Sequence, residues 1–201
     1  MKILRFIAII YASLLMVNAA QADHHKQTMW DVIVNDNRFT TFATLVEEAD
    51  LIELFDERAK FPVTVYIPTN FGFSTMPQAM SSAFRYAVNK DVLVKLIRSH
   101  YFLGTYQNPA EGSEFVTVNI DGNKVKIAQD KDLFVKDMVI RDKEISVGNK
   151  KIIPVDCVMF VQPSRQDARL TEDQQERFNI TSCCLRTMKE TAAFLNSVVF
   201  E

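Results

Sequence analysis

Apolar residues recur at helical spacing through the first half of the chain. Residues 39–49 place them on one face of a helix, and residues 92–97 do so again after an aspartate that can cap the helix. Thr28 with Asp31 three residues later has the form of a capping box, which predicts a helix start. Between these helices, the β-branched and aromatic run at residues 63–67 predicts a strand. Shorter helices are predicted at residues 51–55, directly after Thr69 and at residues 79–88.

The second half of the chain carries short runs that favour strands. Residues 115–120 and 125–127 flank Asp121-Gly122-Asn123, a turn sequence typical of a hairpin. Further strands are predicted at residues 133–135, 138–140, 145–147 and within 152–161. Because helices dominate the first half and strands the second, the pattern predicts an α+β fold rather than a series of βαβ units.

The last part of the chain has a different pattern. Residues 165–176 are polar, and Thr171 begins another capping box. Apolar residues from Leu185 to Val199 then recur at alternating spacings of three and four, which predicts an amphipathic helix. We therefore expect residues 164–201 to be a helical C-terminal extension packed on the preceding domain. A homodimer formed through this helix is the alternative.

The first residues have the pattern of a secretory signal peptide. Basic residues precede an apolar stretch, residues 6–17, that is too short to span a bilayer, and Ala20-Gln21-Ala22 is a cleavage signal. We expect residues 1–22 to be removed and residues 23–27 to be a flexible new N-terminus. No later apolar run predicts a transmembrane anchor, so we expect secretion to the periplasm or to the cell surface and exterior.

The charge balance bears on the kind of partner. Loss of Lys2 and Arg5 with the signal peptide leaves 21 of the 23 basic residues against 25 acidic ones, a net charge of −4. This balance argues against a nucleic-acid partner, because phosphates bind basic surfaces. It neither favours nor excludes a protein partner.

Three cysteines, Cys157, Cys183 and Cys184, bear on the redox state of the chain. An exported protein can keep disulfides, and an odd number leaves one thiol unpaired within the chain. We expect Cys157 to bond to Cys183 or to Cys184, which would tie the extension to the domain. In the alternative interpretation, Cys157 is a buried strand residue and only the tail pair reacts.

Catalytic and metal chemistry have little support. His100 lies beside apolar residues at the end of a predicted helix, which favours a packed structural residue over a general base. We therefore predict no enzymatic activity, no cofactor and no metal site in the domain. If Asp23 becomes the first residue, Asp23-His24-His25 could hold Cu(II) or Ni(II) in square-planar geometry, but an incidental terminus is the favoured interpretation.

Three segments resemble one known family in order and spacing. Residues 63–70 read VTVYIPTN with Phe73 following, residues 93–106 read LVKLIRSHYFLGTY, and residues 144–163 read EISVGNKKIIPVDCVMFVQP. They resemble the signature segments of the fasciclin domain, and the resemblance covers residues 28–163. It implies a β-wedge of about seven strands with flanking helices and no enzymatic activity.

The motif residues have structural roles under this resemblance. Proline ends the strand because it has no N–H to donate, and the following threonine can cap the helix. The residues to which the resemblance assigns structural roles are Thr64, Pro68, Thr69, Asn70, Phe73, Asn149 and Asp156.

The resemblance also implies a function in recognition. Animal fasciclin domains are associated with integrin binding through a tyrosine–histidine region and an Asp-Ile loop, which correspond here to Ser99-His100-Tyr101 and Glu144-Ile145. The displaced tyrosine and the replaced aspartate favour general adhesion or extracellular and envelope recognition of a protein or glycan surface over integrin binding. A periplasmic small-ligand or carbohydrate binder is the alternative. The candidate contact residues are His100, Tyr101, Asp142, Lys143, Glu144 and Ile145.

Overall fold

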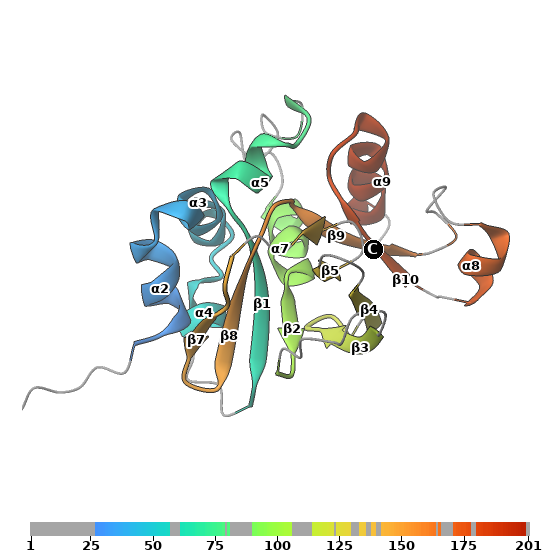
Figure 1. Ribbon diagram of the computed structural model, residues 1–201. Coiled ribbons are helices and arrows are strands. Elements are labelled where there is room, and N and C mark those ends of the chain that lie inside the picture. The colour runs from blue at the N-terminus through green and yellow to red at the C-terminus, as the bar shows by residue number, and fades with distance from the viewer. Residues whose placement is uncertain are drawn as a thin grey trace, which may run out of the picture.

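The computed structural model describes residues 27–56, 61–78, 80, 90–105, 114–122, 124–129, 133–135, 138–139, 142–163, 165, 171–177 and 180–199. Within these ranges, helices lie against one mixed sheet and a smaller two-stranded sheet (Figure 1). The predicted α+β class is therefore confirmed. The main sheet has eight strands in the described residues, where about seven were expected.

Helices fill the first part of the chain, as the apolar spacing predicted. Those before the first strand are α2 (Met29–Asn35), η1 (Asn37–Phe39), α3 (Thr40–Glu48) and α4 (Ile52–Asp56), and those after it are α5 (Asn70–Ser74) and α7 (Lys90–Ser99). The predicted capping box is present at Thr28, whose Oγ1 accepts from the Asp31 N–H at 3.0 Å while its own N–H donates to Asp31 at 2.7 Å. The helix predicted at residues 79–88 lies largely outside the described residues.

The main sheet runs in the order β6-β5-β4-β3-β2-β1-β8-β7. Its strands are β1 (Val63–Pro68), β2 (Tyr101–Leu103), β3 (Glu114–Asn119), β4 (Lys124–Gln129), β5 (Leu133–Val135), β6 (Met138–Val139), β7 (Ile145–Val147) and β8 (Lys150–Val155). Strand β1 pairs antiparallel with β2 and parallel with β8, so it is bonded on both sides, and every one of its residues is buried. The predicted hairpin is β3–β4, whose turn contains Gly122 at φ +81°.

The core lies between the helices and this sheet. Its centre is aromatic: the ring of Phe55 meets those of Phe42 and Tyr101 edge to face, each at a centroid separation of 5.8 Å. Helices α2, α3 and α4 lie together beside strands β7 and β8 in Figure 1, so the N-terminal helices cover the end of the sheet where β1 is paired. The helical first half of the sequence therefore buries the strand on which the family motif begins.

The C-terminal extension is only partly helical. Helices α8 (Glu172–Arg177) and α9 (Met188–Val199) are present, but β10 (Ile180–Cys184) lies between them and pairs antiparallel with β9 (Met159–Pro163). The sequence predicted a helical extension and no strand within it, so the strand at residues 180–184 corrects that expectation. The physical reason is that β9 offers a strand edge to a segment with β-branched residues, and the ladder outweighs a weak local preference. Helix α9 contacts β9 and α7, so it packs on the preceding domain as expected.

Candidate contact surface and the buried histidine

The strand-to-helix corner after β1 is held by side-chain hydrogen bonds. Thr69 Oγ1 accepts from the Gly72 N–H at 3.4 Å and caps α5. Asn70 Oδ1 accepts from the Thr41 N–H at 3.0 Å, while its Nδ2 donates to the Asn37 carbonyl at 2.8 Å. These bonds attach the start of α5 to η1 and α3, which is a structural role.

Gly72 allows a close approach that the sequence did not predict. A methyl group at this position would lie 2.9 Å from the carbonyl carbon of Asp156, closer than side chains pack against backbone. The backbone of Asp156 and Cys157 occupies the space that a side chain would need. The neighbouring Phe73 is buried, whereas Phe71 is 61% exposed.

The other motif residues are placed as follows. The buried Thr64 donates from Oγ1 to the Gly104 carbonyl at 2.9 Å, which ties β1 to the end of β2. Asn149 is exposed in the turn between β7 and β8, beside Gly148 at φ +63°. Asp156 is buried, and its Oδ1 lies 3.6 Å from Arg186 Nη2.

His100 is fully buried and both of its ring nitrogens are hydrogen-bonded. Nε2 accepts from the backbone N–H of Met159 at 2.9 Å, so the proton resides on Nδ1, which donates to the Leu96 carbonyl at 2.8 Å. The neutral ring therefore joins the last turn of α7 to the first residue of β9. Burial lowers the pKa of His100 to about 4, against a smaller raising effect of the bond to Leu96.

The expected surface role of His100 and Tyr101 is contradicted by this burial. His100 is 0% exposed and Tyr101 is 3% exposed, with its ring against Phe55. A partner that docks on the folded surface reaches neither side chain. In the sequence both residues have apolar neighbours. The sequence could not show that residues from the distant elements α3 and β9 also cover the histidine.

The four remaining candidate contact residues do lie together, in the segment leading into β7. Asp142, Lys143 and Glu144 are exposed, and Ile145 is half-buried as the first residue of the strand. Asp142 Oδ2 accepts from Arg38 Nη1 at 2.8 Å, and Glu144 pairs with Lys151 of β8. The segment is therefore tied on one side to η1 and on the other to the sheet.

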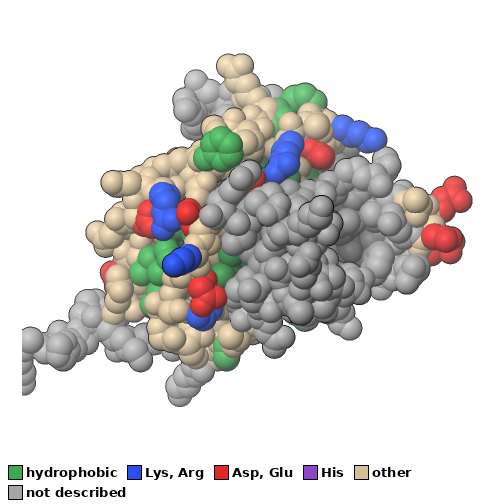
Figure 2. All heavy atoms as spheres, viewed as in Figure 1, with side chains coloured by type: hydrophobic (Ala, Val, Ile, Leu, Met, Phe, Trp, Pro, Cys, Tyr) green, Lys and Arg blue, Asp and Glu red, His purple; other side chains and the backbone are tan. Residues whose placement is uncertain are grey.

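Arg38 is the centre of a small charged network. It donates to both carboxylate oxygens of Asp36 as well as to Asp142, and its guanidinium lies 5.3 Å from the ring centroid of Phe39. The hydrogen bond from Arg38 lowers the pKa of Asp36, and the two carboxylates raise the pKa of Arg38. On the left part of the face drawn in Figure 2, basic and acidic side chains lie next to one another, whereas the side chains coloured at the far right, where α8 lies, are acidic.

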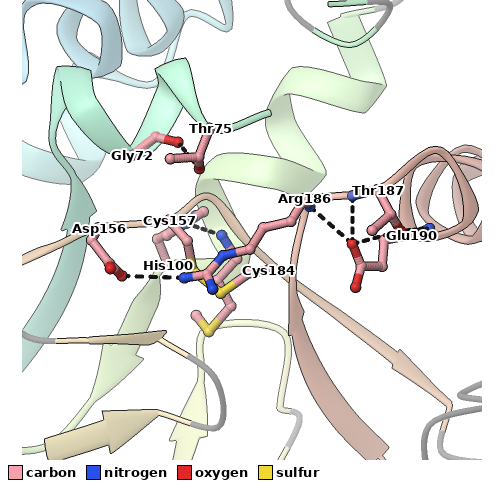
Figure 3. The surroundings of a disulfide bond; sticks show 10 residues. Gly72, Thr75, His100, Asp156, Cys157, Cys184, Arg186, Thr187 and Glu190 are labelled. Atoms are coloured by element: carbon pink, nitrogen blue, oxygen red, sulfur yellow. Dashed lines mark hydrogen bonds and ion pairs between the residues drawn. A yellow bond between two sulfur atoms is a disulfide. The ribbon is translucent and has the colours of Figure 1, made fainter. Parts of the chain in front are cut away.

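The extension is fastened to the domain by a disulfide between Cys157 and Cys184, with a Cα–Cα distance of 5.6 Å. The sequence left Cys183 and Cys184 as alternative partners, and the structure selects Cys184. The side chain of Cys183 lies outside what the structure describes. Figure 3 shows His100, Asp156 and Arg186 around this bond.

The described residues hold neither a metal-binding cluster nor a membrane-spanning helix. Across the described ranges, no group of three or more His, Cys, Asp or Glu residues is arranged to hold a metal ion. The segment Asp23-His24-His25 lies outside those ranges, as do residues 1–22. Among the helices that the structure describes, none is long and apolar enough to cross a membrane.

Comparison with known proteins finds relatives that are similar in sequence and a solved structure that is similar in fold. "Protein sll1483" from Synechocystis sp. is 31% identical over 120 residues, which cover 56% of this chain and 65% of that protein. "Uncharacterized protein sll1735" from the same organism is 24% identical over 132 residues, covering 65% of this chain and 96% of that protein. A solved FAS1 domain pair from the insect cell adhesion molecule Fasciclin I has a TM-score of 0.53 at 11% identity, covering 65% of this chain and 49% of that one.

The share of each chain that a match covers decides whether the match shows a fold or a family. The chain spans less than two thirds of sll1483 and about half of the FAS1 domain pair, and the structural likeness, at its low identity, shows the fold. The model of the Fasciclin domain matches residues 37–161, which is more than half of the 201 residues. The chain therefore belongs to the fasciclin domain family.

Proposed function

We propose that this protein is exported and acts without bond chemistry, in cell adhesion or in recognition of a protein or glycan surface outside the cytoplasm. The observation that carries the proposal is the exposed segment at residues 142–144, which ion pairs hold in place at both ends. The solved FAS1 pair belongs to a cell adhesion molecule, which supports the same direction.

The geometry of this segment suits recognition. Asp142 is tied to Arg38 and Glu144 is tied to Lys151, so a partner would meet charges whose positions are already restricted. Pre-organised contact groups lose less conformational entropy on binding. Charged groups at the rim of an interface act mainly on association rate and on the choice of partner. Lys143, exposed between the two carboxylates, is the side chain best placed to distinguish an acidic partner surface.

Two further observations support export and the absence of catalysis. The Cys157–Cys184 disulfide fits an oxidising compartment, in agreement with the predicted signal peptide. His100 is buried with both ring nitrogens already bonded, so it has no nitrogen available to act as a general base.

The experiment is a binding assay with a charge reversal and a matched control. Lys143→Glu reverses the exposed charge of the segment, and Lys189→Glu makes the same change at an exposed position of α9. Purified proteins immobilised on beads are tested for binding to sister cells, host cells and extracellular matrix. We expect Lys143→Glu to change binding several-fold while Lys189→Glu leaves it as in the unmodified protein. Equal binding by all three proteins would remove the segment from the proposal.

A further inference from the structure

The segment Ile180–Val199, which comprises β10 and α9 and is called the tail here, closes over part of the domain. Its strand runs beside β9 in a five-residue ladder from Ile180 opposite Pro163 to Cys184 opposite Met159. The Leu185 N–H then donates to the Val158 carbonyl at 2.8 Å, and the Leu185 side chain is fully buried. The tail is therefore docked along the whole of β9.

The surface under the tail is apolar. Phe160 of β9 is fully buried, and its ring lies 5.6 Å from that of Phe194 in α9, which is also fully buried. Helix α9 contacts α7 in addition to β9. Since the family match ends at residue 161, the tail is an addition to the matched domain and supplies the cover for this apolar face.

Beyond the backbone ladder, side-chain bonds attach the described part of the tail at residues 186–190. Arg186 reaches Asp156 across 3.6 Å, and Glu190 accepts from the N–H groups of Arg186 and Thr187, which directly precede α9 (Figure 3). The covalent fastening is the disulfide between Cys157, just before β9, and Cys184, at the end of β10. It stands at the point where the tail leaves its ladder and turns into α9.

We propose that the tail is a redox-controlled latch, held closed over Phe160 by the Cys157–Cys184 disulfide and released when a dithiol reduces that bond. The release uncovers the apolar face of β9 while the main sheet stays folded. Release of the tail does not depend on whether the segment at residues 142–144 binds a partner.

The chemical step is an ordinary thiol–disulfide exchange. A thiolate of the dithiol attacks the Sγ of Cys184, which is 2% exposed where Cys157 is 0% exposed, and Cys157 leaves as a thiolate that takes up a proton. The second thiolate of the reductant then attacks the reductant's sulfur in the mixed disulfide and releases Cys184 as a thiolate, which takes up a proton. The reductant ends as a cyclic disulfide, and the protein gains two electrons and two protons as two thiols. Because both cysteines are almost fully buried, reduction requires the end of β10 to open transiently.

The test is hydrogen exchange of the full chain, followed by mass spectrometry of peptides, in oxidising buffer and in dithiothreitol. A second protein, Cys157→Ala with Cys184→Ala, lacks the bond without any reductant. The matched control is Arg186→Ala, which removes the Asp156 ion pair and keeps the disulfide. A dye that fluoresces on apolar surface reports on uncovering of β9.

The latch predicts a localised change. Reduction, or the double alanine variant, should speed exchange in β10 and α9 by roughly 100- to 1,000-fold, which is the factor that loop-closure entropy assigns to a crosslink of this span. Peptides of β1 and β8 should keep their protection, dye fluorescence should rise, and Arg186→Ala should change the tail far less. Unchanged tail protection in the reduced chain would overturn the latch. Simultaneous loss of protection in β1, β8 and the tail would overturn it too, because the tail would then be part of one cooperative core.

Discussion

Acid should destabilise this domain through one buried side chain. His100 has a pKa of about 4 in the folded protein, against an ordinary value of 6.5 in an unfolded chain. Between these values the unfolded state binds more protons, so the free energy of unfolding falls as the pH falls. The stability due to the neutral ring is fully present above pH 6.5 and is lost as the pH approaches 4.

The magnitude follows from the two pKa values. Complete protonation corresponds to about 3 kcal/mol, and lowering the pH from 7 to 5 costs about 2 kcal/mol from this residue. Structurally, the cost arises because a protonated Nε2 cannot accept from the Met159 N–H, while the charge has no water around it. For a domain of this size, about 2 kcal/mol is a large part of the total stability.

The assay is urea unfolding at several pH values between 4 and 7.5, for the unmodified chain and for His100→Asn. Asparagine offers an acceptor for Met159 and does not titrate, so we expect a shallower dependence of unfolding free energy on pH for the variant. The carboxylates and the two N-terminal histidines are the same in both proteins, so the difference in slope isolates His100. If the variant does not fold, NMR titration of the His100 ring in the unmodified chain gives its pKa directly. A ring that titrates near 6.5, or equal slopes in the two proteins, would refute the reasoning.

Three further predictions concern stability and are measured by urea or thermal unfolding. Gly72→Ala should lower the free energy of unfolding by about 1–3 kcal/mol because the methyl group meets the backbone of Asp156. Phe71→Ala, on the exposed side of α5, should change it by no more than about 0.5 kcal/mol. Equal effects of the two changes would contradict the close approach. Asn70→Ala should cost about 1–2 kcal/mol because the Asn70 side chain connects α5 to η1 and α3, and an unchanged midpoint would show that these bonds are replaced by water. Removal of the disulfide, which spans 27 residues, should lower the free energy of opening the tail by about 3–4 kcal/mol in the loop-entropy account, so the tail should unfold in a separate, earlier step than the main sheet, and a loss below about 1 kcal/mol would contradict it.

Much of the fold follows from local patterns in the sequence. The strand at residues 63–67, the Thr28 capping box, the cap at Thr69 and the β3–β4 turn all depend on neighbouring residues, so their chemistry is visible in a short window. The single apolar run at residues 152–161 was less informative, because it holds the end of β8, a bend and the start of β9. An apolar run shows that residues are buried without showing where the chain turns.

The features that escaped prediction depend on contacts between distant segments. Strand β10 forms because β9 presents an edge to it, and the register of that ladder decides which of two adjacent cysteines reaches Cys157. Likewise, the burial of His100 depends on Phe42 from α3 and Met159 from β9, which are far from it in sequence. The requirement for glycine at position 72 comes from a backbone 84 positions further along. The sequence could name candidate contact residues, but it could not show which of them this packing buries.

The central claim is that the chain is exported and that its fold is closed by the Cys157–Cys184 disulfide in the compartment where it acts. Peptide mass spectrometry of the protein, isolated from its native cells with thiols blocked at lysis and digested without reductant, reads both features in one measurement. The account predicts a mature N-terminus at Asp23 and a peptide pair joined through Cys157 and Cys184. A chain that retains residues 1–22 and carries blocked thiols at Cys157 and Cys184 would contradict it.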